Sequence, residues 1–196
     1  MTVNHKNSST AGQEFFYGIS RKKNYRKAFP YLLDAAANGY VHAQNLVGYC
    51  YSRGLGVRKH KRAAAYWYKQ AAHAGHREAL WNLALLYERG TGVQRSFKKA
   101  FALYKRAAEL GNPVAQRKLG AIYTEGLAGK QNSKVGIDWY RKAARKGDAE
   151  AQYRLGSIYR NGEGVRQNRR QAESWLERAA KQGHKKATRA LKSLRK

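Results

Sequence analysis

Apolar and small residues recur along the chain at the spacing of an amphipathic helix. Ala43, Val47 and Tyr51 lie four positions apart and share one helical face, and Gly54 follows where a helix would end. After a short turn, residues 61–74 predict a second helix that closes at Gly75. Its apolar face consists of Ala64, Trp67, Tyr68, Ala71 and Ala72. The pattern therefore predicts two helices joined by a tight turn, helix A and helix B.

The whole two-helix pattern repeats along the chain without a gap. Gly54, Gly90, Gly126 and Gly162 are each 36 positions apart, and the same step relates the Ala pairs that begin at residues 35, 71, 107, 143 and 179. Such a period indicates a repeat protein in which each unit packs on its neighbours. Inside helix A the small residues Gly48, Ala84, Gly120 and Gly156 form a column. Because they lower helix propensity, we expect close contact with helix B at these positions.

The repeated residues carry a family resemblance. The pattern A...LG..Y..G.GV.....A..WY..AA..G, most complete in AQYRLGSIYRNGEGVRQNRRQAESWLERAAKQG, resembles the Sel1-like repeat, a relative of the tetratricopeptide repeat. The resemblance implies an all-α fold, a right-handed α-solenoid of about five 36-residue helix-turn-helix repeats plus a terminal capping helix. It also implies a non-enzymatic adaptor that brings other proteins together.

Domain boundaries follow from the repeat. We expect a flexible polar tail over residues 1–10, repeats over 11–39, 40–75, 76–111, 112–147 and 148–183, and a C-terminal capping helix over 185–196. Two departures from the pattern stand out. The first unit lacks the Ala of helix A, which predicts a frayed amino-terminal cap, and Gly136 replaces an Ala, which predicts a looser helix B in the fourth unit.

Charge is the most unusual property of the composition. Lys and Arg number 40 against 12 Asp and Glu, a formal net charge of +28. Such an excess favours an anionic partner. The position that opens helix B, where the family usually has Asp, holds Asn24, His60, Ser96, Asn132 and Asn168, so capping is kept while the negative charge is lost.

Basic residues occupy the first turn of every predicted helix B, where the helix dipole disfavours a cation. These residues are Arg26, Arg62, Lys98, Lys134 and Arg170. One interpretation is a row of anion-binding sites in which the side chains act together with exposed backbone N–H groups. The other is a solvated outer face on which screening makes the dipole cost negligible.

A second column lies on helix A, beside its buried stripe. In a tetratricopeptide-like stack the A helices line the concave face, so side chains there are candidates for contacting one extended partner. The candidates are Asn45, Tyr49, Trp81, Arg117, Tyr153 and Arg154. The alternative is packing between repeats by unusually large side chains. The basic run at residues 58–62 is a local elaboration of the turn, or else a nuclear targeting signal.

Other function classes have little support in the sequence. His73 and His76 have no nearby ligand set for a metal, no phosphate-binding loop follows a strand, and Cys50 occupies an apolar column, so we predict no enzyme, metal or cofactor. With one cysteine, no apolar signal segment and no run of eighteen apolar residues, the expectation is a cytoplasmic protein without membrane insertion.

Two functional hypotheses remain. The first is a scaffold or adaptor whose concave face binds a protein partner with an acidic surface or segment. The second is a basic solenoid that binds RNA or DNA mainly through phosphate contacts. Repeat architecture favours the first and the charge of +28 favours the second. We adopt the adaptor as the working hypothesis.

Overall fold

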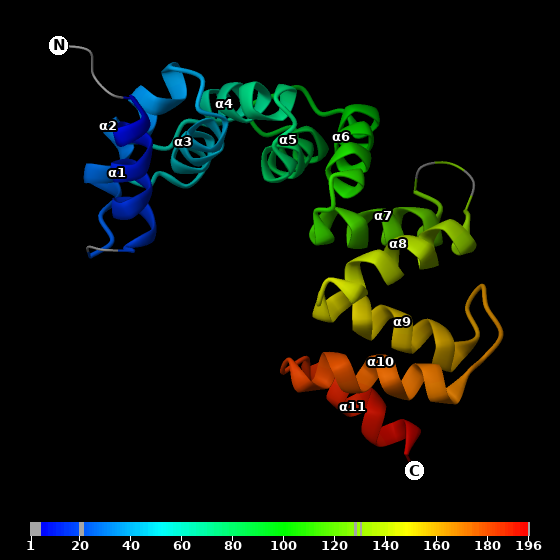
Figure 1. Ribbon diagram of the computed structural model, residues 1–196. Helices are drawn as coiled ribbons and strands as arrows, with labels where there is room; N and C mark the ends of the chain where they lie inside the picture. The colour runs from blue at the N-terminus through cyan, green and yellow to red at the C-terminus, as the bar shows by residue number, and fades with distance from the viewer. Residues whose placement is uncertain (1–4, 20–21, 128, 130, 196) are drawn as a thin grey trace. The chain divides into compact units, whose positions relative to one another are not determined.

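The computed structural model describes residues 5–19, 22–127, 129 and 131–195, which form eleven α-helices and no strand (Figure 1). The helices are α1 (His5–Tyr17), α2 (Tyr25–Ala37), α3 (Val41–Arg53), α4 (Lys61–His73), α5 (Arg77–Arg89), α6 (Phe97–Glu109), α7 (Pro113–Glu125), α8 (Ser133–Arg145), α9 (Ala149–Asn161), α10 (Arg169–Lys181) and α11 (Lys185–Leu194). The chain divides into two compact units, residues 1–106 and residues 107–196.

Helices A and B alternate as the 36-residue period predicts. The A helices are α3, α5, α7 and α9, and the B helices are α4, α6, α8 and α10, with α1 and α2 as a first pair. Within the units, α1 packs on α2, α3 on α4, α7 on α8 and α9 on α10. The all-α solenoid prediction is confirmed.

The turn from helix A to helix B has the same construction in every repeat. Gly54, Gly90, Gly126 and Gly162 cap their A helices with left-handed backbone, as the C-terminal glycines predicted. The backbone N–H of His60 then donates to the carbonyl of Tyr51 at 2.9 Å. The same bond joins Asn24 to Phe15, Ser96 to Tyr87, Asn132 to Tyr123 and Asn168 to Tyr159. One backbone hydrogen bond in each repeat therefore joins an aromatic residue near the end of helix A to the residue that caps helix B.

The small residues of helix A lie where the two helices of a repeat approach most closely. A Cβ atom placed on Gly48 would lie 2.7 Å from the ring of Tyr68, and one on Gly120 would lie 2.7 Å from the ring of Tyr140. The predicted close contact is confirmed. Gly136 has the same role from helix B, since its Cβ would lie 2.8 Å from the carbonyl oxygen of Gly120. The prediction that Gly136 loosens helix B is wrong, because α8 runs unbroken past a glycine that permits close packing.

Glutamines of helix A connect successive repeats. Gln44 Nε2 donates to the carbonyl of Ala36, Gln116 Nε2 to that of Ala108, and Gln152 Nε2 to that of Ala144. Each carbonyl lies near the carboxyl end of the preceding helix B and also accepts the backbone N–H three residues later, so the glutamine provides a second donor. Ala36, Ala108 and Ala144 are buried, and each presents its carbonyl to the next repeat.

The two ends of the chain differ from expectation in one respect. Residues 5–10, expected to belong to a flexible tail, lie in α1, where Ser8 and Ser9 are buried. Residues 1–4 of that tail lie outside the described residues. α1 packs closely on α2, because a Cβ on Gly12 would lie 2.8 Å from Leu32. At the other end α11 packs on α10 (Figure 1).

Candidate partner-binding site

A cleft of about 260 Å³ opens in the first unit between the A helices α3 and α5 and the start of α4. It is named the basic cleft here, because Arg53, Lys59, Lys61 and Arg89 line it and no acidic residue does. All four of these residues are exposed. The remaining lining residues are Tyr49, Ser52, Tyr68, Asn82, Leu85, Leu86 and Thr91.

The cleft is built by the repeat frame. Arg53 and Arg89 are the last residues of α3 and α5, while Lys59 and Lys61 flank the capping residue of α4. Tyr68 is 2% exposed, and burial raises the pKa of its hydroxyl, which shares a hydrogen bond with the side chain of Ser52. The neutral tyrosine hydroxyl and its serine partner therefore supply polar groups beneath a rim of cations.

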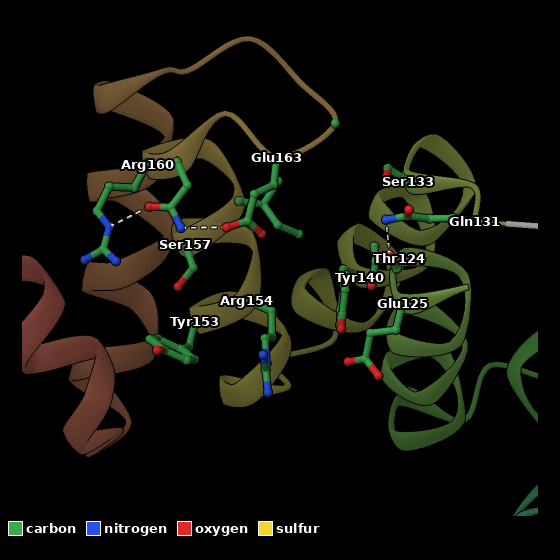
Figure 2. A pocket seen from close by; sticks show the side chains of 13 residues that line it. Thr124, Glu125, Gln131, Ser133, Tyr140, Tyr153, Arg154, Ser157, Arg160 and Glu163 are labelled. Atoms are coloured by element: carbon green, nitrogen blue, oxygen red, sulfur yellow. Dashed lines mark hydrogen bonds between the residues drawn. The ribbon is translucent and has the colours of Figure 1, made fainter. Parts of the chain in front are cut away.

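The second unit has a cleft at the equivalent place, between α7 and α9, with a volume of about 670 Å³. Figure 2 shows Glu125 and Tyr140 on one wall, with Arg154 and Ser157 on the other. Asn161 Nδ2 donates to Glu163 Oε1 at 2.6 Å, and both residues line this cleft. Since Glu125 and Glu163 offset the cations Arg154 and Arg160, this is named the mixed cleft.

Residues two repeats apart show how the clefts differ. Adding 72 to the positions that line the basic cleft gives Glu125 for Arg53, Gln131 for Lys59, Ser133 for Lys61 and Asn161 for Arg89. Tyr68 and Tyr140 occupy the same place in the two floors. The frame is thus kept while four positive charges are replaced by neutral or acidic side chains. Because the mixed cleft folds without them, these cations are not needed for the turn.

Three of the predicted concave-face residues pack against neighbouring helices. The ring of Trp81 lies 5.0 Å from that of buried Tyr104, and Tyr153 stacks on His184 with ring centroids 4.7 Å apart. Arg117 Nε lies 3.1 Å from Asp148 Oδ1. Asp148 and His184 are also the amino-terminal caps of α9 and α11. Arg117 and Tyr153 thus contact the cap of the next repeat's first helix, as the packing alternative predicts, whereas Trp81 packs within its own repeat. Tyr153 also lines the mixed cleft.

The other predicted concave-face residues divide between packing and the clefts. Asn45 is only 7% exposed, and its Oδ1 accepts a bond from Asn82 Nδ2 at 3.3 Å, so its placement on an open binding face is wrong. Tyr49 lines the basic cleft and Arg154 lines the mixed cleft, where Arg154 also pairs with Glu150. Sequence reasoning missed Arg53 and Arg89, and it noted Lys59 and Lys61 only as part of the basic run at residues 58–62. A comparison of residues two repeats apart is the signal that would have found them.

The basic column on helix B keeps only part of its expected geometry. Arg26, Arg62, Lys98, Lys134 and Arg170 are all exposed in the first turn of their helices. The anion-site interpretation also needs exposed backbone N–H groups at the start of helix B, and these groups are partly covered. A Cβ on Gly56 would lie 3.0 Å from the backbone nitrogen of Arg26, and one on Gly92 would lie 2.9 Å from that of Arg62. The turn of the following repeat thus covers the helix start, and the anion-binding role of this column stays a prediction about side chains alone.

His76 gives the first unit a pH dependence that can be measured. Its Nδ1 accepts the N–H of Ala79, its Nε2 lies 3.2 Å from His42 Nδ1, and burial lowers its pKa. Glu78 opposes this shift, whereas His42 and Arg77 add to it. Because the unfolded chain binds the proton more readily, this contribution to stability is complete above about pH 6.5 and declines as the pH falls below it.

We expect the urea midpoint of the chain to fall more between pH 7.5 and pH 5 than that of the variant His76→Asn, whose cap does not titrate. An equal fall in both proteins would assign the pH dependence to other groups. Measurement of both midpoints in the same buffers checks the prediction.

Three further observations concern metal-binding clusters, membrane spans and the cysteine. Among the described residues, no three or more His, Cys, Asp or Glu side chains are gathered so that they could hold a metal ion. No helix in the described ranges combines the length and the apolar character of a membrane span. Cys50 is fully buried, and burial raises the pKa of its thiol to about 12, which disfavours the reactive thiolate.

Comparison with known families gives one consistent result. The family model for the Sel1 repeat matches residues 11–40, 41–76, 77–112, 113–148 and 149–184. These five segments agree in number with the repeats predicted from the sequence, with borders one residue later. No curated protein sequence matches the chain significantly.

Solved structures resemble the chain over nearly its whole length. The protective antigen c5321 of uropathogenic Escherichia coli, described as displaying an SLR fold, is 36% identical, with a TM-score of 0.85 over 97% of this chain and 41% of that one. A Sel1 repeat protein from Oxalobacter formigenes is 31% identical, with a TM-score of 0.90 over 97% of this chain and 78% of that one. The chain thus spans less than half the length of the Escherichia coli antigen. The immunity protein Pa5087 from Pseudomonas aeruginosa, 20% identical with a TM-score of 0.62 over 95% of this chain and 73% of that one, shares the fold.

Proposed function

The chain belongs to the Sel1 repeat family, and we propose that it is a non-enzymatic scaffold that binds an acidic segment of a protein partner in the basic cleft. Sel1 repeat proteins generally serve as scaffolds for protein–protein interaction. The acidic partner and its place on the A-helix face are specific to this proposal, as is a cytoplasmic location. A single buried cysteine is compatible with that location.

One observation carries the proposal, the uncompensated charge of the basic cleft. Four cations line the basic cleft and no carboxylate does, whereas two carboxylates line the equivalent mixed cleft. Cations held together repel one another unless an anion binds between them. Repeats of the same frame fold with or without this charge, so we assign it to recognition. An extended acidic segment supplies several carboxylates along a groove, which suits a cleft between successive helices.

The test compares two variants with the same change in net charge. The cleft variant carries Arg53→Gln, Lys59→Gln and Arg89→Gln, and the control carries Lys185→Gln, Lys186→Gln and Lys192→Gln, which are exposed and line neither cleft. A fluorescent peptide of alternating glutamate and serine is titrated at about 0.15 M ionic strength. We expect the cleft variant to bind about tenfold more weakly than the parent and the control to bind within about twofold, because each exposed ion pair contributes about 0.2–1 kcal/mol and a tenfold loss corresponds to about 1.4 kcal/mol.

Equal losses in the two variants would mean that net charge alone attracts the peptide, and the cleft assignment would then be abandoned. Single-stranded RNA of matched charge is titrated in parallel. If RNA binds far more tightly than the peptide and shows a steep linear fall of log affinity with log salt, the nucleic-acid hypothesis replaces the scaffold. Equal melting temperatures of the three proteins confirm that only binding has changed.

A further inference from the structure

We infer that the basic cleft is a site for a phosphorylated side chain on the partner segment. This inference rests on the proposed function and names the group that the cleft recognises. It follows from the donor inventory of the cleft, from the placement of its two arginines, and from comparison with the mixed cleft.

The charged groups that line the cleft are all hydrogen-bond donors. Arginine and lysine offer no acceptor, and the nearby hydroxyls of Ser52 and Thr91 can also donate. A phosphorylated serine or threonine brings a charge of about −1.5 to −2 and three strong acceptor oxygens. A single carboxylate brings one charge and two oxygens. Four cations around one cleft are therefore matched better by a phosphate than by one carboxylate.

The two arginines are placed for planar recognition of such a group. They end neighbouring A helices, and the guanidinium of Arg53 lies 5.8 Å from the centre of the Tyr49 ring. Stacking on an aromatic ring restricts a guanidinium while leaving its edge free to donate. An arginine binds phosphate oxygens through two parallel N–H bonds, whereas a lysine acts as a point charge. The cleft thus combines two guanidinium groups that can each bind two phosphate oxygens with two lysine ammonium groups.

A cation at the end of a helix is also favoured by the helix dipole, so this explanation has to be weighed. In the second unit, Glu125 and Asn161 end α7 and α9, and the same left-handed glycine follows each of them. Dipole stabilisation therefore does not dictate the arginines at the equivalent positions of the first unit. A local role for the pair Arg53 and Arg89 in binding explains the contrast.

The experiment uses the full chain and three peptides that differ at one position. A short segment with phosphoserine between glycines and glutamates is compared by calorimetry with its serine and glutamate forms. We expect the phosphoserine form to bind at least about tenfold more tightly than the glutamate form, and inorganic phosphate at millimolar concentration to compete with it. The conservative variant Arg53→Lys/Arg89→Lys keeps the charge but loses the guanidinium groups, so we expect it to remove most of this preference.

The outcomes distinguish failure of the phosphate inference from failure of the acidic-segment proposal. Equal binding of the phosphoserine and glutamate forms would overturn the phosphate inference and leave the acidic-segment proposal intact. Failure of all three peptides to bind would overturn both. A phosphate preference that survives in the lysine variant would exclude arginine geometry as its cause and overturn the assignment to these residues. As a gain-of-function arm, Glu125→Arg/Asn161→Arg is expected to give the mixed cleft measurable affinity for the phosphoserine form.

Discussion

Replacing Gly92 by alanine is expected to lower the free energy of unfolding by about 2–5 kcal/mol. Gly92 has a φ of +73°, a region that costs an L-residue about 1–2 kcal/mol. A Cβ there would also lie 2.4 Å from the carbonyl oxygen of Lys61, which belongs to the backbone of the preceding helix B. Backbone cannot move aside as a side chain can, so overpacking adds about 1–3 kcal/mol. Urea unfolding followed by circular dichroism measures the change.

Gly75 provides the matched control. Its φ is +81°, and no atom lies within 4 Å of a Cβ built on it. Gly75→Ala is therefore expected to lower the free energy of unfolding by about 1 kcal/mol, from the left-handed backbone alone. The lower entropy of the unfolded chain offsets part of this loss. If both variants lost the same stability, the close approach of one repeat's turn to the preceding helix would have no energetic weight. A larger loss at Gly92 would establish that contact as part of what joins successive repeats.

The fold could be predicted from the sequence because it depends on residues that recur. Glycines that end each helix, alanines at close contacts and a capping residue at each helix start all repeat at one period, and each has a local physical reason. Gly136 shows the limit of this reasoning. From propensity alone it weakens a helix, yet the structure shows that any larger residue would meet the carbonyl of Gly120. Propensity describes one helix, whereas the sign of the effect depends on its neighbour.

The candidate site was harder to predict because its residues come from three separate segments. Arg53 ends one A helix, Lys59 and Lys61 flank a cap, and Arg89 ends the next A helix. Neither the family pattern nor the helical stripe marks any of them. The column of Trp81, Arg117 and Tyr153 drew attention because its members are large and variable. A position that packs against a neighbouring side chain can also be large and variable when that neighbour differs between repeats. Here the neighbours are Tyr104, Asp148 and His184.

The packing role of that column leads to the second large effect. The triple variant Trp81→Ala/Arg117→Ala/Tyr153→Ala is expected to lower the free energy of unfolding by about 4 kcal/mol. Truncation of a fully buried Trp costs about 3–5 kcal/mol, so the partly buried Trp81 accounts for about 2. Loss of the ion pair with Asp148 and of the ring pair with His184 adds about 1 kcal/mol each. This reverses the expectation for residues on an open binding face, whose truncation leaves stability unchanged.

The same variant distinguishes packing from recognition when stability and binding are measured together. Because none of the three side chains lines the basic cleft, the folded triple variant should bind the acidic peptide with unchanged affinity. The cleft variant Arg53→Gln/Lys59→Gln/Arg89→Gln should show the opposite combination, with parental stability and weakened binding. Trp81→Phe and Tyr153→Phe keep an aromatic ring at each contact and are expected to lose much less stability than the alanine changes. A triple variant with the parental urea midpoint and no peptide binding would show that Trp81, Arg117 and Tyr153 bind the peptide and that the basic cleft does not.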